Sequence, residues 1–322
     1  MHRSVTTSIC LIAFLMAGFA SVEAKEYTFD YHRVVKPDGE ISLDLTYLEG
    51  DLTVVGNDFG ELVVEATKKV HAVSMDEAEV IQGYIEIRFR EDGDKVVVTA
   101  NYLKMRDRGK SFWKKLLGDG GSDSFGEIDW KISVPDDCNV IVTNTRGDMN
   151  IGHIRGDVAI RSSAADLVLS SIEGDVHIEN GSGSTVGDLL FGNVEVRQPQ
   201  GTIDLQWIEG DVRIKSSSAG IKVGQERGSI DLTTSTGSVE IRTSLDSSRE
   251  FFVETESGDI NLTIPESASG RLDIRSESGE IKTEMPVTIE SMTRKQVVGE
   301  FGFGGVRVSL NSISGDVTVA MF

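Results

Sequence analysis

The sequence is nearly free of cysteine. Its 322 residues contain two, Cys10 and Cys138. Cys10 lies in an N-terminal apolar run that we expect to be removed, so Cys138 is left alone. A single cysteine excludes an intramolecular disulfide and a thiolate metal site. Because Cys138 precedes an apolar run, we predict a buried, small hydrophobic side chain there.

Basic residues, aromatic residues and long apolar runs are also scarce. Lys and Arg number 32 against 52 Asp and Glu, which gives a net charge of −20, and aromatic residues make up 7% of the chain. An acidic balance of this size argues against nucleic acid as a partner and against unassisted binding to anionic lipid. After the N-terminal run, no segment is long and apolar enough to predict a transmembrane helix.

Residues 1–24 have the pattern of a secretory signal peptide. Arg3 precedes an apolar run over residues 9–20, and Val22-Glu23-Ala24 forms a small-residue cleavage site. The apolar run is too short to span a bilayer. We therefore expect an exported protein that begins at Lys25 and acts in the periplasm, outside the cell or at its surface. Cys10 lacks the neighbouring small residues of a lipoprotein motif, which argues against a lipid anchor.

A nine-residue repeat runs from Gly147 to Ser238. Its first position is followed, two and four residues later, by apolar residues that flank a polar one, as in Val176-His177-Ile178. Such a triplet predicts a short, half-buried strand, because side chains alternate between the faces of a strand. Nine of the eleven first positions are glycine: Gly147, Gly156, Ala165, Gly174, Gly183, Gly192, Gly201, Gly210, Ala219, Gly228 and Gly237.

The residues two positions before each repeat indicate the length of one coil. They alternate between large apolar and small or polar: Ile154, Ser163, Ile172, Gly181, Leu190, Pro199, Ile208 and Ser217. Two repeats therefore make one coil of 18 residues with two strands, whereas a 27-residue coil of three strands would stack isoleucine on serine. Beyond Gly237 the glycines stand 21 residues apart, at Gly258 and Gly279, so we expect wider coils there.

The predicted fold class is all-β, a single-stranded parallel β-solenoid with about two short strands per coil of 18–21 residues. We expect a right-handed coil, and about 15 coils if the whole mature chain follows this rule. Residues 25–135 are predicted to form N-terminal capping and less regular β coils, and residues 136–322 the regular solenoid. Ser74 and Glu77 form a capping box, which predicts a short helix in the N-terminal part.

One segment of the chain, the inserted loop 103–126, is basic and apolar in an otherwise acidic protein. Loops are where solenoids place contacts, so this loop is a candidate contact for a membrane surface, an anionic glycan or a partner protein. The alternative is an elaborated hairpin whose aromatic residues fold back on the solenoid wall. The candidate contact residues are Lys104, Arg106, Arg108, Lys110, Phe112, Trp113, Lys114, Lys115, Leu116 and Leu117.

Three parts of the mature chain are distinctive in combination. They are residues 50–54 with 63–68 (Gly-Asp-Leu-Thr-Val, then Val-Val-Glu-Ala-Thr-Lys), the strand 128–135 (Ile-Asp-Trp-Lys-Ile-Ser-Val-Pro), and the closing residues 304–308 with 314–319. Together they resemble a bacterial putative-adhesin family of unknown function that is built from β-strand repeats. The resemblance implies an exported β-solenoid associated with the cell envelope, in some members with envelope stress responses. It supplies no catalytic residues.

Aspartates are the candidate metal ligands. An 18-residue coil would stack Asp157, Asp175 and Asp211 along one edge, with Asn193 among them, and Asp148 over Asp166 along the other. Carboxylates about 4.8 Å apart repel one another, and a calcium ion between them would relieve the repulsion. The simpler interpretation is that each aspartate serves its own turn and faces water, so we predict no cofactor, with calcium as the alternative.

The sequence shows no catalytic constellation. Its acidic residues are scattered by the repeat, and its histidines lack metal-ligand spacing; His177 occupies an outward repeat position. We therefore predict a protein without catalytic activity, an adhesin-like or scaffold module of the cell envelope whose partner is an envelope glycan or protein. A carbohydrate-active β-helix enzyme acting on polysaccharide is one alternative. An envelope stress sensor or accessory protein is the other.

Overall fold

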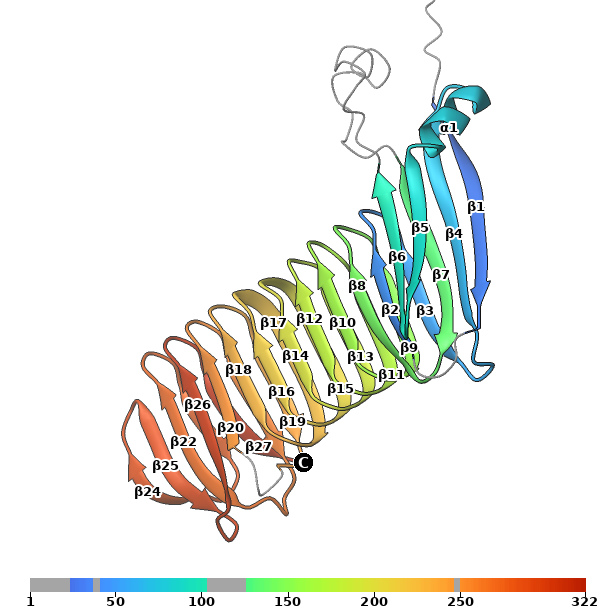
Figure 1. The fold of residues 1–322 in the computed structure, drawn as a ribbon. Helices are drawn as coiled ribbons and strands as arrows, with labels where there is room; N and C mark the ends of the chain where they lie inside the picture. Colours follow the sequence, from blue (N-terminus) through green and yellow to red (C-terminus); the bar gives the residue numbers. More distant parts are fainter. Residues whose placement is uncertain (1–23, 37–40, 103–125, 246–249) are drawn as a thin grey trace, which may run out of the picture.

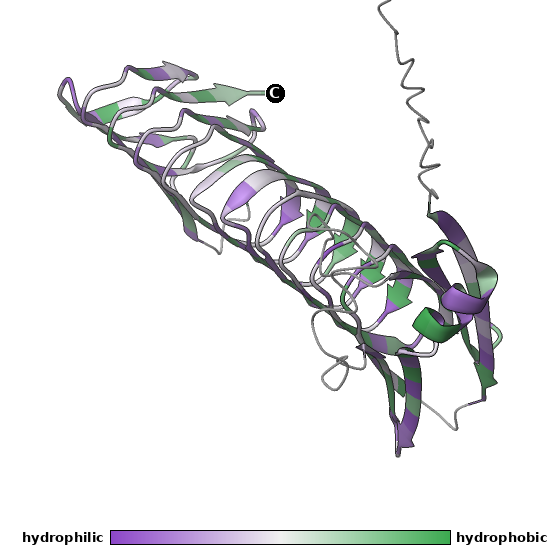
Figure 2. Cartoon of the chain, turned by 90° about the horizontal axis from the view of Figure 1, so that it is seen from above, coloured by the Kyte–Doolittle hydropathy of each residue, from purple (hydrophilic) through white to green (hydrophobic). Residues whose placement is uncertain are grey.

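The structure is a computed structural model that describes residues 24–36, 41–102, 126–245 and 250–322. These residues form two long β-sheets that face each other along an elongated stack (Figure 1). Seen from above, the N-terminal strands and the single helix of the described residues lie at one end of this stack (Figure 2). No helix within the described ranges is long and apolar enough to cross a membrane.

The first sheet, here called sheet A, has 13 strands. In spatial order they are β1 (Lys25–Val35), β4 (Leu62–Ala72), β7 (Glu127–Pro135), β3 (Leu52–Asn57), β9 (Met149–Arg155), β11 (Leu167–Glu173), β13 (Ser184–Phe191), β15 (Gln200–Glu209), β17 (Ser218–Arg227), β19 (Val239–Thr243), β21 (Ile260–Ile264), β27 (Val317–Met321) and β23 (Ile281–Glu284).

The second sheet, sheet B, has 14 strands. In spatial order they are β24 (Thr288–Met292), β25 (Gln296–Phe301), β22 (Gly270–Ser276), β26 (Val306–Ser312), β20 (Glu250–Thr255), β18 (Ile230–Thr234), β16 (Val212–Lys215), β14 (Val194–Arg197), β12 (Val176–Asn180), β10 (Val158–Ser162), β8 (Cys138–Thr143), β2 (Ile41–Thr46), β6 (Lys95–Tyr102) and β5 (Ile85–Asp92).

The strand register confirms the predicted solenoid and its coil of two strands. In sheet B, Val158 pairs in parallel with Val176, which is 18 residues later. In sheet A, Leu167 pairs with Thr185 at the same separation. Farther along the chain, Val239 pairs with Ile260, 21 residues later, so the predicted widening of the coils is also confirmed.

The core lies between the sheets and follows the period of two. Val176 and Ile178 of β12 point inward and are at most 2% exposed, while His177 between them points outward. Facing side chains of sheet A, such as Leu167 and Leu169, are each 1% exposed. Because each coil contributes only a few such side chains, burial becomes complete when neighbouring coils stack.

The corners of the coil explain the repeating glycine. A Cβ atom added to Gly192 would stand 2.2 Å from the carbonyl oxygen of Gly174, one coil earlier. Glutamines also hold two corners. Gln198 Nε2 donates to the carbonyl oxygens of Gly183 and Thr202, at 2.9 and 3.0 Å, and Gln225 Nε2 donates to those of Gly210 and Ser229, at 2.7 and 2.9 Å. Close backbone contact and buried amide bonds thus set the spacing of coils at the corners.

The stacking order departs from the order of the chain at both ends. The early coil of β2 and β3 lies between the coil of β6 and β7 and that of β8 and β9. At the other end, β26 and β27 lie between the coil of β20 and β21 and that of β22 and β23. Antiparallel strands β1, β4, β5, β24 and β25 complete the ends. The expected 15 coils were therefore too many, because terminal strands close the stack instead of continuing it.

The predicted short helix is confirmed as α1 (Met75–Gln82). Ser74 Oγ accepts the N–H of Glu77 at 3.3 Å, and Glu77 Oε2 accepts the N–H of Val73 at 2.9 Å. These bonds satisfy main-chain donors that a helix start leaves unpaired. Ala78 and Ile81 are the buried residues of α1, so the helix packs on the N-terminal end of the solenoid.

Candidate functional site

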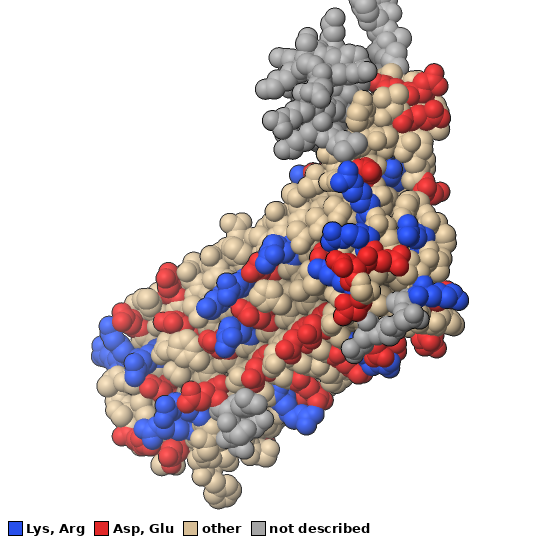
Figure 3. All heavy atoms as spheres, in the orientation of Figure 1, with Lys and Arg blue, Asp and Glu red and all other residues tan. Residues whose placement is uncertain are grey.

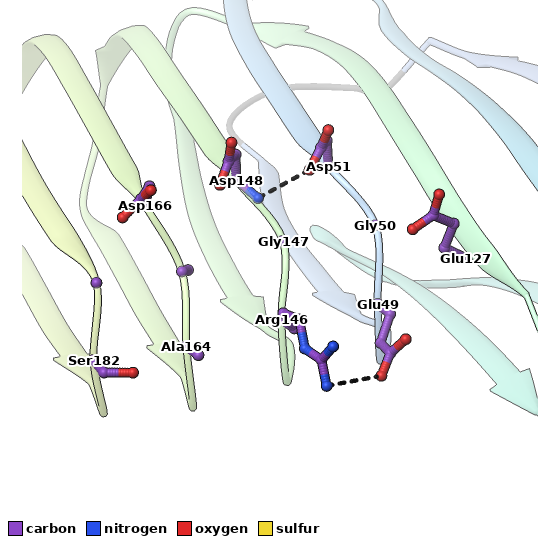
Figure 4. A pocket seen from close by; sticks show the side chains of 12 residues that line it. Glu49, Gly50, Asp51, Glu127, Arg146, Gly147, Asp148, Ala164, Asp166 and Ser182 are labelled. Atoms are coloured by element: carbon purple, nitrogen blue, oxygen red, sulfur yellow. Dashed lines mark hydrogen bonds and ion pairs between the residues drawn. The ribbon is translucent and has the colours of Figure 1, made fainter. Parts of the chain in front are cut away.

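Aspartates stack along one corner of the coils, as the repeat predicts. Figure 4 shows Asp51, Asp148 and Asp166 on successive coils. They border a hollow of about 370 Å³. Asp51 Oδ1 accepts the N–H of Asp148 at 3.0 Å, and Asp166 Oδ1 accepts the N–H of Ser184 at 2.7 Å. The carboxylates of Asp51 and Asp166 therefore each link their own coil to the next.

The opposite corner has the same construction. Asp157 Oδ1 accepts the N–H of Asp175, Asp175 Oδ1 accepts that of Asn193, both at 2.9 Å, and Asp211 Oδ1 accepts that of Ser229 at 2.8 Å. These aspartates therefore bond the next coil, whereas the sequence analysis expected each to serve its own turn and face water, with calcium as the alternative. Among the described residues, no group of three or more His, Cys, Asp and Glu side chains could hold a metal ion.

The outer face of sheet B is covered by paired charges. Arg161 Nε lies 2.7 Å from Glu179 Oε2, and this arginine lowers the pKa of Glu179. His177 lies between Glu179 and Glu195, at 3.5 and 3.6 Å. Figure 3 shows basic and acidic side chains interspersed over the face that it draws. Exposed pairs of this kind favour solubility and contribute little to stability.

Cys138 is buried, as predicted. Its side chain is 1% exposed at the start of β8, and burial raises the pKa of the thiol to about 11. A thiol with this pKa is almost entirely protonated near neutral pH and is a poor nucleophile and metal ligand. Cys138 therefore acts as a small apolar side chain of the core.

The most unusual backbone of the described residues is on the outer face of sheet A. Four non-glycine residues with left-handed backbone follow one another at 18-residue intervals: His153 (φ 58°), Ser171 (φ 54°), Leu189 (φ 57°) and Trp207 (φ 54°). Their neighbours remain in register, Ser170 with Asp188 and Ile172 with Leu190. The four residues thus form a stacked bulge, which we call the left-handed ridge.

The left-handed ridge exposes apolar side chains at a conformational cost. Leu189 and Trp207 are 40% and 60% exposed, and Phe191 beside them is 42% exposed. A left-handed backbone costs a non-glycine residue about 1–2 kcal/mol. Such strain persists where surrounding structure imposes it, and it is concentrated at functional sites. Repetition of both features over successive coils makes the left-handed ridge the candidate binding surface.

A hollow of about 190 Å³ lies at the C-terminal end of the left-handed ridge. Trp207 forms part of its wall together with Phe322, whose ring lies under the guanidinium of Arg242 with 3.3 Å between the Arg242 Cζ atom and the ring centroid. Glu226 and Gln206 add a carboxylate and an amide. The hollow therefore combines an exposed indole with polar groups of several kinds.

A second hollow, of about 460 Å³, lies at the N-terminal end of the left-handed ridge. It is lined by His153 and Ser171 and by Phe59, which is 83% exposed in the turn between β3 and β4. Arg155 also lines it and bonds Asp136 at 2.7 Å. The left-handed ridge thus connects two hollows, each with an exposed aromatic ring.

Sequence reasoning missed the left-handed ridge. The contact that it predicted is the loop Lys104 to Leu117, which lies outside the described residues. Residues 1–23 of the predicted signal peptide also lie outside them. A signal existed, because Leu189 and Trp207 are large apolar residues 18 apart, each directly before an inward Leu190 or Ile208. The left-handed conformation itself leaves no mark in the sequence when the residue is not glycine.

Comparisons with known proteins point to one family. Residues 126–320 match the family model described as Toastrack DUF4097. No curated protein matches the chain.

Several solved structures of bacterial proteins are similar to the chain. One is a putative cell adhesion protein from Clostridium sporogenes, with 10% identity, a TM-score of 0.23, and coverage of 92% of this chain and 100% of that one. Another is a putative adhesin from Bacteroides fragilis, with 12% identity, a TM-score of 0.35, and coverage of 92% and 97%. A putative lipid binding protein from Parabacteroides distasonis has 13% identity, a TM-score of 0.26, and coverage of 91% and 96%. Likeness at this level leaves the ligand to be argued from the residues of this chain.

Proposed function

The chain belongs to the Toastrack DUF4097 family, and from that premise we propose that it is an exported, adhesin-like binding module without catalytic activity. Its ligand is an extended polymer of the cell envelope, which lies along the left-handed ridge. Binding of this kind needs a preformed surface, and stacked coils provide one at little entropic cost.

The observation that carries the proposal is the continuity of the left-handed ridge. His153 and Trp207 stand three coils apart, which corresponds to about 14 Å at the usual spacing of neighbouring strands. Leu189 and Phe191 lie between the two hollows and expose apolar surface there. Exposed apolar surface that is held in a strained backbone favours a contact role over simple solubility.

The ionisable groups support a role in binding. A neighbouring arginine lowers the pKa of two exposed carboxyl groups, Asp137 and Glu179. A general acid for glycoside hydrolysis needs a raised pKa. Both groups are surface ion pairs and therefore lack the property that a general acid needs.

Co-sedimentation with fractionated bacterial envelopes tests the proposal. The mature protein, Lys25–Phe322, is compared with a triple variant in which Leu189, Phe191 and Trp207 are replaced by serine. The matched control is Ile289→Ser, which removes a side chain that is 51% exposed on β24, far from the left-handed ridge. We expect the triple variant to lose binding and the control to keep it; equal binding by both would refute the proposal.

The basic loop is a second contact in this proposal. Replacing residues 104–117 with a short Gly-Ser turn, in the same assay, separates its role from that of the left-handed ridge. If only the loop variant loses binding, the polymer contacts the basic loop and not the left-handed ridge. If both variants lose binding, the polymer is held by the two together.

A further inference from the structure

We infer that the C-terminal hollow is a subsite for one neutral sugar ring, which stacks on the indole of Trp207. The inference rests on the proposed function and specifies the chemistry of its ligand. Trp207 is 60% exposed, and it belongs to a hollow of about 190 Å³. This space is smaller than the 300–1,000 Å³ typical of sites for drug-sized ligands, so it accepts one ring of a longer chain.

The indole of Trp207 provides a platform for the sugar. The C–H groups of one face of a sugar ring form an apolar surface, which packs well on an aromatic ring. An indole presents a large apolar face without the entropy cost of a flexible side chain. The left-handed backbone of Trp207 turns this ring outward, while Ile208, the next residue, remains buried at 0% exposure.

The polar groups around the hollow match sugar hydroxyls, which donate and accept hydrogen bonds together. Arg242 provides donors and Glu226 provides acceptors, and Gln206 provides both. Two of them are already held in place: Gln206 Nε2 donates to Asp204 Oδ1 at 2.7 Å, and the Arg242 guanidinium is stacked on Phe322. Groups that are held in this way lose little entropy when a ligand binds.

The charges favour a neutral sugar over an anionic ligand. The charged side chains that line the hollow are one cation and one anion, Arg242 and Glu226. The protein as a whole has a net charge of −20. The negative charge of the protein would repel an acidic polysaccharide or an anionic lipid headgroup, whereas it would not repel a neutral polymer.

The remainder of the sugar chain follows the left-handed ridge. From Trp207 the next exposed apolar groups are Leu189 and Phe191, one coil away, and the path ends at the hollow beside Phe59. Successive contacts are spaced by about 4.8 Å, the distance between neighbouring strands. Longer oligosaccharides should therefore bind more tightly than single sugars.

Calorimetric titration of the mature protein with cellohexaose and chitohexaose tests the inference, with hexagalacturonate as the anionic comparison. We expect at least one neutral hexasaccharide to bind, and Trp207→Leu to weaken it about tenfold or more, because leucine is apolar but offers no flat ring. Trp207→Phe should restore most of the affinity. The matched control is Phe303→Leu, since Phe303 is a fully exposed aromatic residue outside the left-handed ridge.

Acrylamide quenching provides a second readout. It uses a Trp113→Phe background, because Trp113 belongs to the candidate contact loop; of the two remaining tryptophans, Trp130 is 2% exposed and Trp207 is 60% exposed. Bound hexasaccharide should protect the fluorescence of this background protein from quenching. It should give no protection in Trp207→Leu, whose far-ultraviolet circular dichroism shows whether the variant is folded.

The outcomes separate this inference from the proposed function. If the serine triple variant loses envelope binding but no hexasaccharide binds, the ligand is another polymer and the inference is wrong while the function stands. Equal affinity of Trp207→Leu and wild type, or tighter binding of hexagalacturonate, would also overturn it. If the triple variant keeps envelope binding, the proposed function is wrong, whatever the result of the sugar titrations.

Discussion

Replacement of Gly192 by alanine should destabilise the solenoid through one contact at a corner. The added Cβ would stand 2.2 Å from the carbonyl oxygen of Gly174 and 2.5 Å from its carbonyl carbon, whereas ordinary contacts of a Cβ begin at 3.4 Å. Both partners belong to main chain, so a side-chain rotation cannot relieve the clash. The two coils must separate locally by about 1 Å.

The cost follows from the hydrogen bonds that hold these coils together. Gly174 N donates to Phe191 O at 3.0 Å, and Val176 N donates to Asn193 O at 2.8 Å. Asn193 N also donates to Asp175 Oδ1, at 2.9 Å. A shift of about 1 Å breaks bonds of this length, and each contributes about 0.5–1.5 kcal/mol. After a gain of about 0.4–1 kcal/mol from the stiffer unfolded chain, we expect a net loss of about 2 kcal/mol.

Gly220→Ala is the matched control, because nothing lies within 4 Å of its added Cβ and its backbone is not left-handed. It should leave the free energy of unfolding unchanged or raise it by about 0.4–1 kcal/mol. Urea unfolding of both variants, followed by circular dichroism, measures the difference. If Gly192→Ala and Gly220→Ala are equally stable within about 0.5 kcal/mol, a typical limit for neutral surface changes, the explanation of the glycine repeat is wrong.

Three further predictions concern single side chains. Gln198→Leu removes the donor to two main-chain carbonyls and should lower the free energy of unfolding by about 1–3 kcal/mol in the same urea assay; an unchanged midpoint would contradict this. Because burial raises the pKa of Cys138 to about 11, a thiol reagent at pH 8 should label it only after unfolding, and rapid labelling of the folded protein would show an open core. Since Arg161 lowers the pKa of Glu179, this pair stabilises the fold above the ordinary pKa of glutamate, and the effect disappears as the pH falls through the lower native value. Arg161→Gln should raise that pKa in an NMR titration, and no change would show that the pair does not form in solution.

The regular coils were predictable because their determinants are local and repeated. Each nine-residue unit places a residue, usually glycine, at a corner and apolar residues at fixed offsets. Because the pattern recurs in every unit, the prediction does not depend on any single unit. The capping box at Ser74 is also local, and α1 begins there. Cys138 was predictable from the apolar run that follows it, and it is buried in the core.

The two ends were not predictable in the same way. Glycine spacing identifies the units but does not say which unit stacks on which, and the terminal units pair with strands far away in the chain. Val317 pairs with Ile260 on one side and with Ile281 on the other. Such pairings depend on how the last apolar layers are covered, which involves the whole end of the molecule.

The candidate site, too, has features that the sequence predicted and features that it did not. The sequence alone determined the coil of two strands, its 18-residue length and the stacked aspartates, because these follow from side-chain type and period. Only the tertiary structure decided that the aspartates link coils through main-chain N–H groups, and that Leu189 and Trp207 point outward from a left-handed bulge. Backbone conformation at a corner is imposed by the register of neighbouring coils, and this register exists only after the coils have stacked.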